Sequence, residues 1–216
     1  MDNMTNACIN FERIRSDLNP LTKLLAVSKS QPFEVIEPVL RQGHRLFGES
    51  RVEEAFEKWA PIKSTYGDIQ LHYIGKLQSR KIGKIVQLFD VIQTVESISS
   101  LEKVAMNAEK YAKLQKVMIQ INIGNEPQKS GVSIDDFHQL YERAIELKAV
   151  HLDGIMCIPP NTDQVRCYFE SMKEIATEYQ LESISMGMSQ DYIEAINCGS
   201  TMIRVGRGIF GERNAK

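Results

Sequence analysis

Eight short apolar segments, each followed by a stretch with helical spacing, limit most strongly how this chain of 216 residues can fold. The segments have the length and the β-branched content of buried strands. They cover residues 23–29, 45–50, 70–75, 91–95, 117–123, 151–158, 183–187 and 202–206. Strands that alternate with helices in this way are typical of a parallel sheet, because each helix carries the chain back to the start of the next strand.

Eight such units predict an α/β fold, a single-domain (β/α)8 barrel spanning residues 1–216 with an N-terminal helix over residues 4–18. The other expected helices cover residues 32–42, 52–58, 80–89, 98–113, 135–148, 163–178 and 191–197. An open, doubly wound sheet is the alternative. No G-x-G-x-x-G motif follows the first strand, which disfavours a dinucleotide-binding version of that sheet.

Charge and cysteine content exclude several classes of protein. The formal net charge is −2, so no overall field attracts nucleic acid or an anionic membrane, and no apolar stretch is long enough for a membrane span. Lys76, Arg80 and Lys84 are interpreted as one solvated helix stripe. The four cysteines contain no C-x-x-C pair and the N-terminus has no apolar signal segment. We therefore expect a cytoplasmic protein with no metal, membrane or nucleic-acid partner.

Lys29 closes the first strand, at the end where barrels carry their chemistry. Leu25, Val27 and Lys29 share one face of that strand, so the lysine would stand at the barrel mouth above an apolar wall. Such a lysine either extends its charged head into solvent or forms a Schiff base with a carbonyl compound. The second outcome requires partial desolvation, which lowers the pKa of an amine and leaves it neutral for attack.

The loops after the seventh and eighth strands have the features of a phosphate site. Ser189 is expected to cap the helix that follows, while Gly206 and Gly208 would let backbone N–H groups approach a ligand and Arg207 would add a positive charge. The alternative is that these glycines only make tight turns. Arg204 is expected to face inward, where its acceptor is either a structural carboxylate or a ligand atom such as a ring nitrogen.

A Schiff-base lysine, a phosphate site and an inward arginine together suit pyridoxal 5′-phosphate. Aldolase-type barrels also combine a Schiff-base lysine with a phosphate site, so the residues alone leave both possibilities open.

A set of short segments spans nearly the whole chain in order: Ala26-Val27-Ser28-Lys29, Phe47-Gly48-Glu49, His72-Tyr73-Ile74-Gly75 with Leu77-Gln78, Gln120-Ile121-Asn122, Lys129-Ser130-Gly131, Gly154-Ile155-Met156, Gly187-Met188-Ser189 with Asp191, and Arg204-Val205-Gly206 with Ile209-Phe210-Gly211. Together these segments resemble one known family, the pyridoxal-phosphate homeostasis proteins, also called the proline-synthetase co-transcribed family.

The resemblance implies a barrel similar to the N-terminal domain of alanine racemase, without a second domain. It also implies that pyridoxal 5′-phosphate is held as an aldimine by Lys29, that its phosphate meets Ser189, Gly206 and Arg207, and that Arg204 faces the pyridine nitrogen. The cofactor site expected on this basis comprises Lys29, Ser50, His72, Met156, Ser189, Arg204, Gly206 and Arg207.

Three positions depart from the family pattern. The family usually has asparagine where this chain has Ser50 and Arg80, and often threonine where it has Arg207. These changes shorten one polar contact near the cofactor and alter the side chain expected at the phosphate.

The expected function is vitamin B6 homeostasis without efficient turnover, performed by a monomer that passes its cofactor to pyridoxal-phosphate-dependent apoenzymes. A pyridoxal-phosphate-dependent racemase, a Schiff-base aldolase and a barrel acting mainly as an interaction protein are the alternatives.

Overall fold

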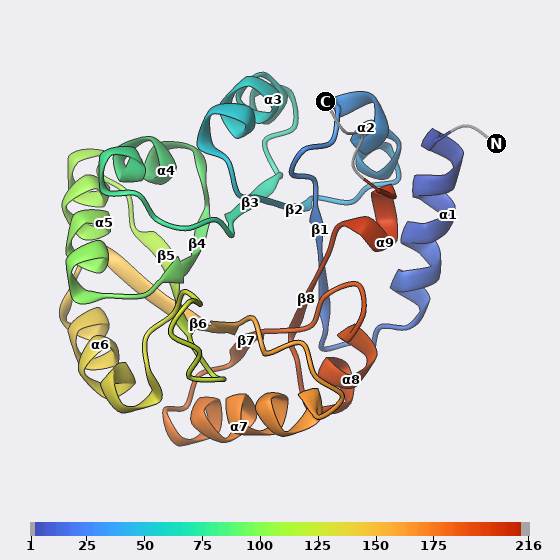
Figure 1. Ribbon diagram of the computed structural model, residues 1–216. Helices are drawn as coiled ribbons and strands as arrows, with labels where there is room; N and C mark the ends of the chain where they lie inside the picture. The colour runs from blue at the N-terminus through green and yellow to red at the C-terminus, as the bar shows by residue number, and fades with distance from the viewer. Residues whose placement is uncertain (1–2, 213–216) are drawn as a thin grey trace.

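The computed structural model describes residues 3–212 and shows a closed barrel of eight parallel strands (Figure 1). The strands are β1 (Lys23–Val27), β2 (Leu46–Glu49), β3 (Gln70–Tyr73), β4 (Val91–Val95), β5 (Gln115–Ile121), β6 (Val150–Cys157), β7 (Ser183–Ser185) and β8 (Met202–Val205). They pair in chain order, and β8 pairs with β1 to close the barrel. The (β/α)8 prediction is therefore confirmed; residues 1–2 and 213–216 of the expected domain lie outside the described part.

Helices surround the barrel as an outer ring (Figure 1). They are α1 (Asn3–Ser16), α2 (Phe33–Arg41), α3 (Val52–Thr65), the 3₁₀ turn η1 (Ser79–Lys81), α4 (Ile82–Leu88), α5 (Ile98–Lys110), α6 (Ile134–Glu146), α7 (Val165–Glu178), α8 (Tyr192–Asn197) and α9 (Arg207–Phe210). The N-terminal helix α1 packs against α2 and α9 at the seam between the first and last units. Within residues 3–212, none of the helices combines the length and the apolar character needed to cross a membrane.

The buried side chains form two layers, as strand alternation requires. The larger layer lies between strands and helices and includes Ile203 and Val205 of β8. The smaller apolar cluster consists of Val91, Met118 and Met156, which face the barrel interior. This arrangement directs the alternate residue of β8, Arg204, inward as the sequence predicted.

A bulge in β6 decides which of its side chains face the barrel interior. The pairing with β5 moves from Val117–Leu152 to Met118–Gly154, so Asp153 is an extra residue. Before the bulge Leu152 packs toward the helices, and after it Ile155 and Cys157 do so. The extra residue thereby reverses the alternation of β6 and turns Met156 inward.

Helix α3 is longer than the sequence predicted, because it continues past residue 58 and through Pro61 to Thr65. A proline inside a helix removes one backbone hydrogen bond. The extra turns bury Trp59 completely and pack Ile62 against the core, which offsets that cost.

The prediction that Lys76, Arg80 and Lys84 form one stripe on a single helix is also wrong. Lys76 lies in the loop after β3, Arg80 lies in η1 and Lys84 lies in α4.

Candidate functional site

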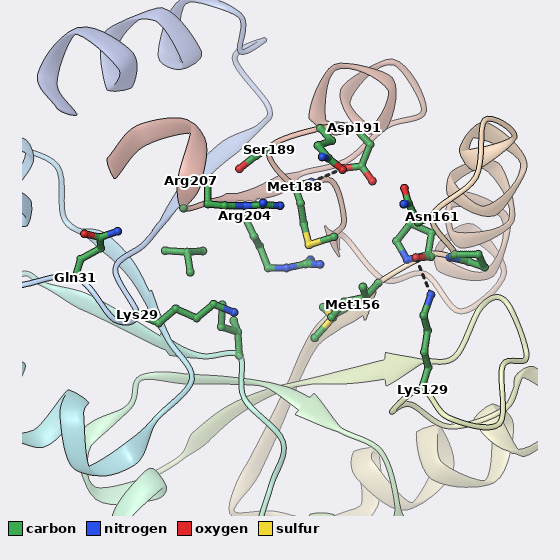
Figure 2. A pocket seen from close by; sticks show the side chains of 17 residues that line it. Lys29, Gln31, Lys129, Met156, Asn161, Met188, Ser189, Asp191, Arg204 and Arg207 are labelled. Atoms are coloured by element: carbon green, nitrogen blue, oxygen red, sulfur yellow. Dashed lines mark hydrogen bonds between the residues drawn. The ribbon is translucent and has the colours of Figure 1, made fainter. Parts of the chain in front are cut away.

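A cavity of about 400 Å³ lies at the carboxyl ends of the strands. It is lined by Val27, Lys29, Gln31, Ile74, Lys129, Met156, Ile158, Pro159, Pro160, Asn161, Met188, Ser189, Gln190, Asp191, Arg204, Gly206 and Arg207. Six of the eight residues expected at the site are therefore brought together: Lys29, Met156, Ser189, Arg204, Gly206 and Arg207. Figure 2 shows Lys29 reaching into the cavity from one side and Ser189 and Arg207 on another, with Arg204 between them.

Lys29 is carried by a tight turn that ends β1. The N–H of Gln31 donates to the carbonyl of Ser28 (3.2 Å), and Ser30 has a positive φ of 61°. A positive φ at the third residue is the mark of a type II turn, in which glycine is the usual residue. The turn leaves Lys29 half-buried beside Val27, at the edge of the cavity.

Arg204 is almost fully buried in the floor of the cavity. Its guanidinium donates from Nη1 to Ser185 Oγ (2.9 Å) and from Nη2 to the backbone carbonyl of Cys157 (2.8 Å). Within residues 3–212, both hydrogen-bond acceptors of Arg204 are neutral, one a hydroxyl and the other a backbone carbonyl, rather than a carboxylate. Burial lowers the pKa of Arg204 and raises the pKa of the Cys157 thiol to about 12, so that thiol is neutral.

A chain of buried hydrogen bonds leads from Arg204 into the barrel. Ser185 Oγ donates to Gln93 Oε1 (2.7 Å), and the Gln93 amide donates to His72 Nδ1 (2.7 Å). Burial lowers the pKa of His72 to about 4. The neutral imidazole accepts at Nδ1 and therefore carries its proton on Nε2.

His72 and Ser50 do not line the cavity. His72 lies deeper in the barrel and is linked to Arg204 through Gln93 and Ser185. Ser50 lines a neighbouring pocket of about 570 Å³ with Arg51, Tyr73 and Lys76.

The loops after β7 and β8 meet at one side of the cavity. The N–H of Gly208 donates to Ser189 Oγ (3.2 Å), which joins the two loops. At Gly206 a side chain would come within 3.0 Å of the Val27 carbonyl oxygen, so glycine allows this loop to lie close to β1. Arg207 is largely exposed, and its guanidinium lies 3.8 Å from Glu212.

The expectation that Ser189 caps the next helix is wrong. Helix α8 begins at Tyr192, and the residue before it is Asp191, whose carboxylate accepts from the N–H of Met188 (2.6 Å). Asp191 therefore shapes the turn, and the Ser189 hydroxyl is directed to Gly208 instead.

Several lining residues were not among those expected at the site. Gln31 follows the Lys29 turn, Lys129 and Asn161 come from the loops after β5 and β6, and Met188 and Asp191 follow β7. Lys129 forms an ion pair with Glu126 and donates to the carbonyl of Pro159 (3.1 Å). Lys129, Met188 and Asp191 lie in segments that carry the family resemblance, so these segments could have identified them as candidate site residues.

A family model and several known proteins match most of this chain. The family model described as alanine racemase, N-terminal domain, matches residues 5–214. The pyridoxal phosphate homeostasis protein of Pasteurella multocida is 36% identical over 202 residues, covering 89% of this chain and 87% of that protein. The protein of the same name from Aquifex aeolicus is 36% identical over 200 residues, covering 88% and 87%.

Solved structures show the same fold. PipY of Synechococcus elongatus, whose structure contains bound PLP, superimposes with a TM-score of 0.87 at 32% identity, covering 95% of this chain and all of that chain. Alanine racemase of Clostridium difficile superimposes with a TM-score of 0.80 at 15% identity, covering 99% of this chain and 58% of that chain, which shows a shared fold.

Proposed function

Because the chain belongs to the family of pyridoxal phosphate homeostasis proteins, built on the alanine racemase N-terminal fold, we propose that it binds pyridoxal 5′-phosphate in the cavity at its barrel mouth. The observation that carries this proposal is the convergence of Lys29, Arg204, Ser189 and Gly206 on one cavity of about 400 Å³. A cavity of this size accommodates a small cofactor, and its lining combines apolar walls with a few charged and polar groups.

Each part of the cofactor has a chemical counterpart in the lining. The amine of Lys29 would condense with the aldehyde, forming a C=N bond and releasing the aldehyde oxygen as water. The Ser189 hydroxyl and the backbone at Gly206 would hold the phosphate, with Arg207 adding positive charge from the exposed rim. Met156 would pack against the ring, and Arg204 would donate to the ring nitrogen.

The two remaining expected residues receive different roles in this proposal. His72 would act from beneath the site, since it contacts the hydrogen-bond chain that ends at Arg204. Ser50 would remain at the neighbouring pocket, without direct contact with the cofactor.

We propose storage and delivery of the cofactor, rather than efficient catalysis, as the role of this site. A guanidinium has only donors, so Arg204 facing the ring nitrogen would keep that nitrogen unprotonated. An unprotonated ring is a poor electron sink for carbanion chemistry. The recipients would be pyridoxal-phosphate-dependent apoenzymes, and the protein would act as a monomer. The four cysteines are free thiols, which supports a cytoplasmic setting.

The test is reduction of the cofactor-loaded protein with borohydride, followed by peptide mass spectrometry. We expect an aldimine absorbance band that reduction removes, and an adduct on Lys29. Lys29→Ala should lose the band while keeping the circular-dichroism spectrum of the folded protein, and Lys23→Ala should behave as wild type because Lys23 lies at the opposite end of β1. An adduct on Lys23 or Lys129 in the wild-type protein would overturn the assignment.

A further inference from the structure

Three charged residues outside the cavity are arranged around the turn that carries Lys29. Glu49 ends β2 and is fully buried, while Lys58 and Glu54 project from α3 with side chains 8% and 25% exposed. Lys58 Nζ lies 2.9 Å from a carboxylate oxygen of each glutamate. None of the three residues lines the cavity, so direct contact with a cofactor does not explain them.

The two peptide groups that flank Lys29 are both held by this cluster. Lys58 Nζ donates to the carbonyl of Ser28 (2.8 Å), which belongs to the peptide group before Lys29. Glu54 accepts from the N–H of Ser30 (2.6 Å), which belongs to the peptide group after Lys29. Because the φ and ψ of Lys29 are the rotations between these two groups, anchoring both fixes its backbone direction.

The side chain of Ser28 adds a third contact that holds the turn in place. The hydroxyl of Ser28 donates to Glu49 Oε1 (2.7 Å), and the indole of Trp59 donates to the same oxygen (3.0 Å). Ser30 has a left-handed backbone conformation, which is unfavourable for a residue with a side chain, and the contact of its N–H with Glu54 helps to maintain it.

We propose, building on the assignment of Lys29 as the Schiff-base lysine, that Lys58, Glu54 and Glu49 are positioning residues that hold its amine toward the cavity. Lys58 and Glu54 are four residues apart on α3, so consecutive turns of one helix present both anchors in fixed relation. The cluster thus couples the outer helix to the reactive amine. A small displacement of a reacting group is costly, which gives such anchoring a chemical purpose beyond stability.

The test compares two ligands that differ at the aldehyde. Pyridoxal 5′-phosphate reports on both the phosphate site and Lys29, whereas pyridoxine 5′-phosphate has an alcohol at that carbon and reports only on non-covalent binding. Lys58→Met should raise the Kd for pyridoxal 5′-phosphate about tenfold or more and slow borohydride-trapped adduct formation on Lys29. It should leave the Kd for pyridoxine 5′-phosphate within about twofold of wild type.

Lys63→Met is the matched control, because Lys63 lies on the same helix and pairs with Asp90 instead (2.6 Å). It should leave both ligand affinities unchanged. If Lys58→Met does not fold, Glu54→Gln carries the same comparison, since that side chain is a quarter exposed and the replacement keeps its shape.

Two results would overturn the positioning role of Lys58, Glu54 and Glu49: an equal loss of affinity for both ligands in the Lys58 variant, or a selective loss for pyridoxal 5′-phosphate in the Lys63 variant as well. A wild-type protein that takes no adduct on Lys29 would overturn the proposed function itself, which separates the two failures.

Discussion

Ser189 connects the two loops that form the expected phosphate site. Its Oγ accepts from the Gly208 N–H, so its own hydroxyl hydrogen can donate to an anion in the cavity. Ser189→Ala should therefore weaken binding of pyridoxal 5′-phosphate by about 1.5–3 kcal/mol, the contribution typical of a hydrogen bond to a charged group. Pyridoxal, which has no phosphate, should lose much less affinity.

Equilibrium titration with both compounds measures the difference. Ser133→Ala is a suitable control, because it removes a helix-capping hydroxyl at α6 outside the cavity. The same loss for pyridoxal as for its phosphate would show that Ser189 only holds the loops together.

His72 makes stability depend on pH. Its folded-state pKa of about 4 lies below the ordinary value of 6.5, so between these values the unfolded chain takes up a proton that the folded chain excludes. The contribution of His72 is present above pH 6.5 and is lost as the pH falls toward 4. The free energy of unfolding should drop by on the order of 2 kcal/mol between pH 7.5 and pH 5 from this residue.

Urea unfolding at several pH values measures this effect. His72→Gln should flatten part of the slope and leave the part due to His44, whose pKa burial also lowers to about 4. An unchanged slope in the His72 variant would mean that the folded protein accommodates a charged imidazole.

The bulge in β6 depends on Gly154. Its φ is +155°, and a side chain there would come within 2.0 Å of the Ser183 carbonyl oxygen on β7. Gly154→Ala should therefore destabilise the protein by about 3 kcal/mol or more, as measured by denaturant unfolding. Gly67→Ala, where a side chain meets no neighbouring atom within 4 Å, should cost much less. If Gly154→Ala and Gly67→Ala lowered the free energy of unfolding by equally small amounts, β6 would be able to shift away from β7.

The alternation of strands and helices could be predicted because apolar periodicity follows directly from which faces are buried. The same parity argument placed Arg204 correctly. Lys29 reaches the cavity as expected, but it lies in the turn after β1 rather than in the strand, so parity does not account for its direction. The bulge could not be predicted, since it depends on how β6 meets β5 and β7, and the continuation of α3 past Pro61 depends on the burial of Trp59. The partner of Ser189 likewise depends on how two loops far apart in sequence meet.

The barrel interior determines what the cavity can do, because it fixes the side chains that line the cavity floor. Arg204 is fixed from below by Ser185 and the carbonyl of Cys157, so it cannot turn away from a ligand without leaving buried polar groups unpaired. Two other titratable groups of the cavity lining are also engaged: Lys129 with Glu126, and Asp191 with the Met188 N–H. Lys29 is the proposed Schiff-base lysine, and Arg207 lies beside Glu212 on the exposed rim. A racemase needs an acid–base group on each face of its substrate, and Lys129 and Asp191 are already occupied in holding loops.

We therefore expect the cofactor-loaded protein to exchange the α-proton of amino acids far more slowly than an enzyme. The measurement is proton NMR of a panel of L-amino acids in deuterated water, with free pyridoxal 5′-phosphate at the same concentration as the baseline. Slow exchange follows from Arg204, because an unprotonated ring nitrogen stabilises the carbanion poorly and raises the barrier to proton removal. Exchange or racemisation at about 1 per second or faster would be ordinary enzyme turnover and would make this barrel a catalyst.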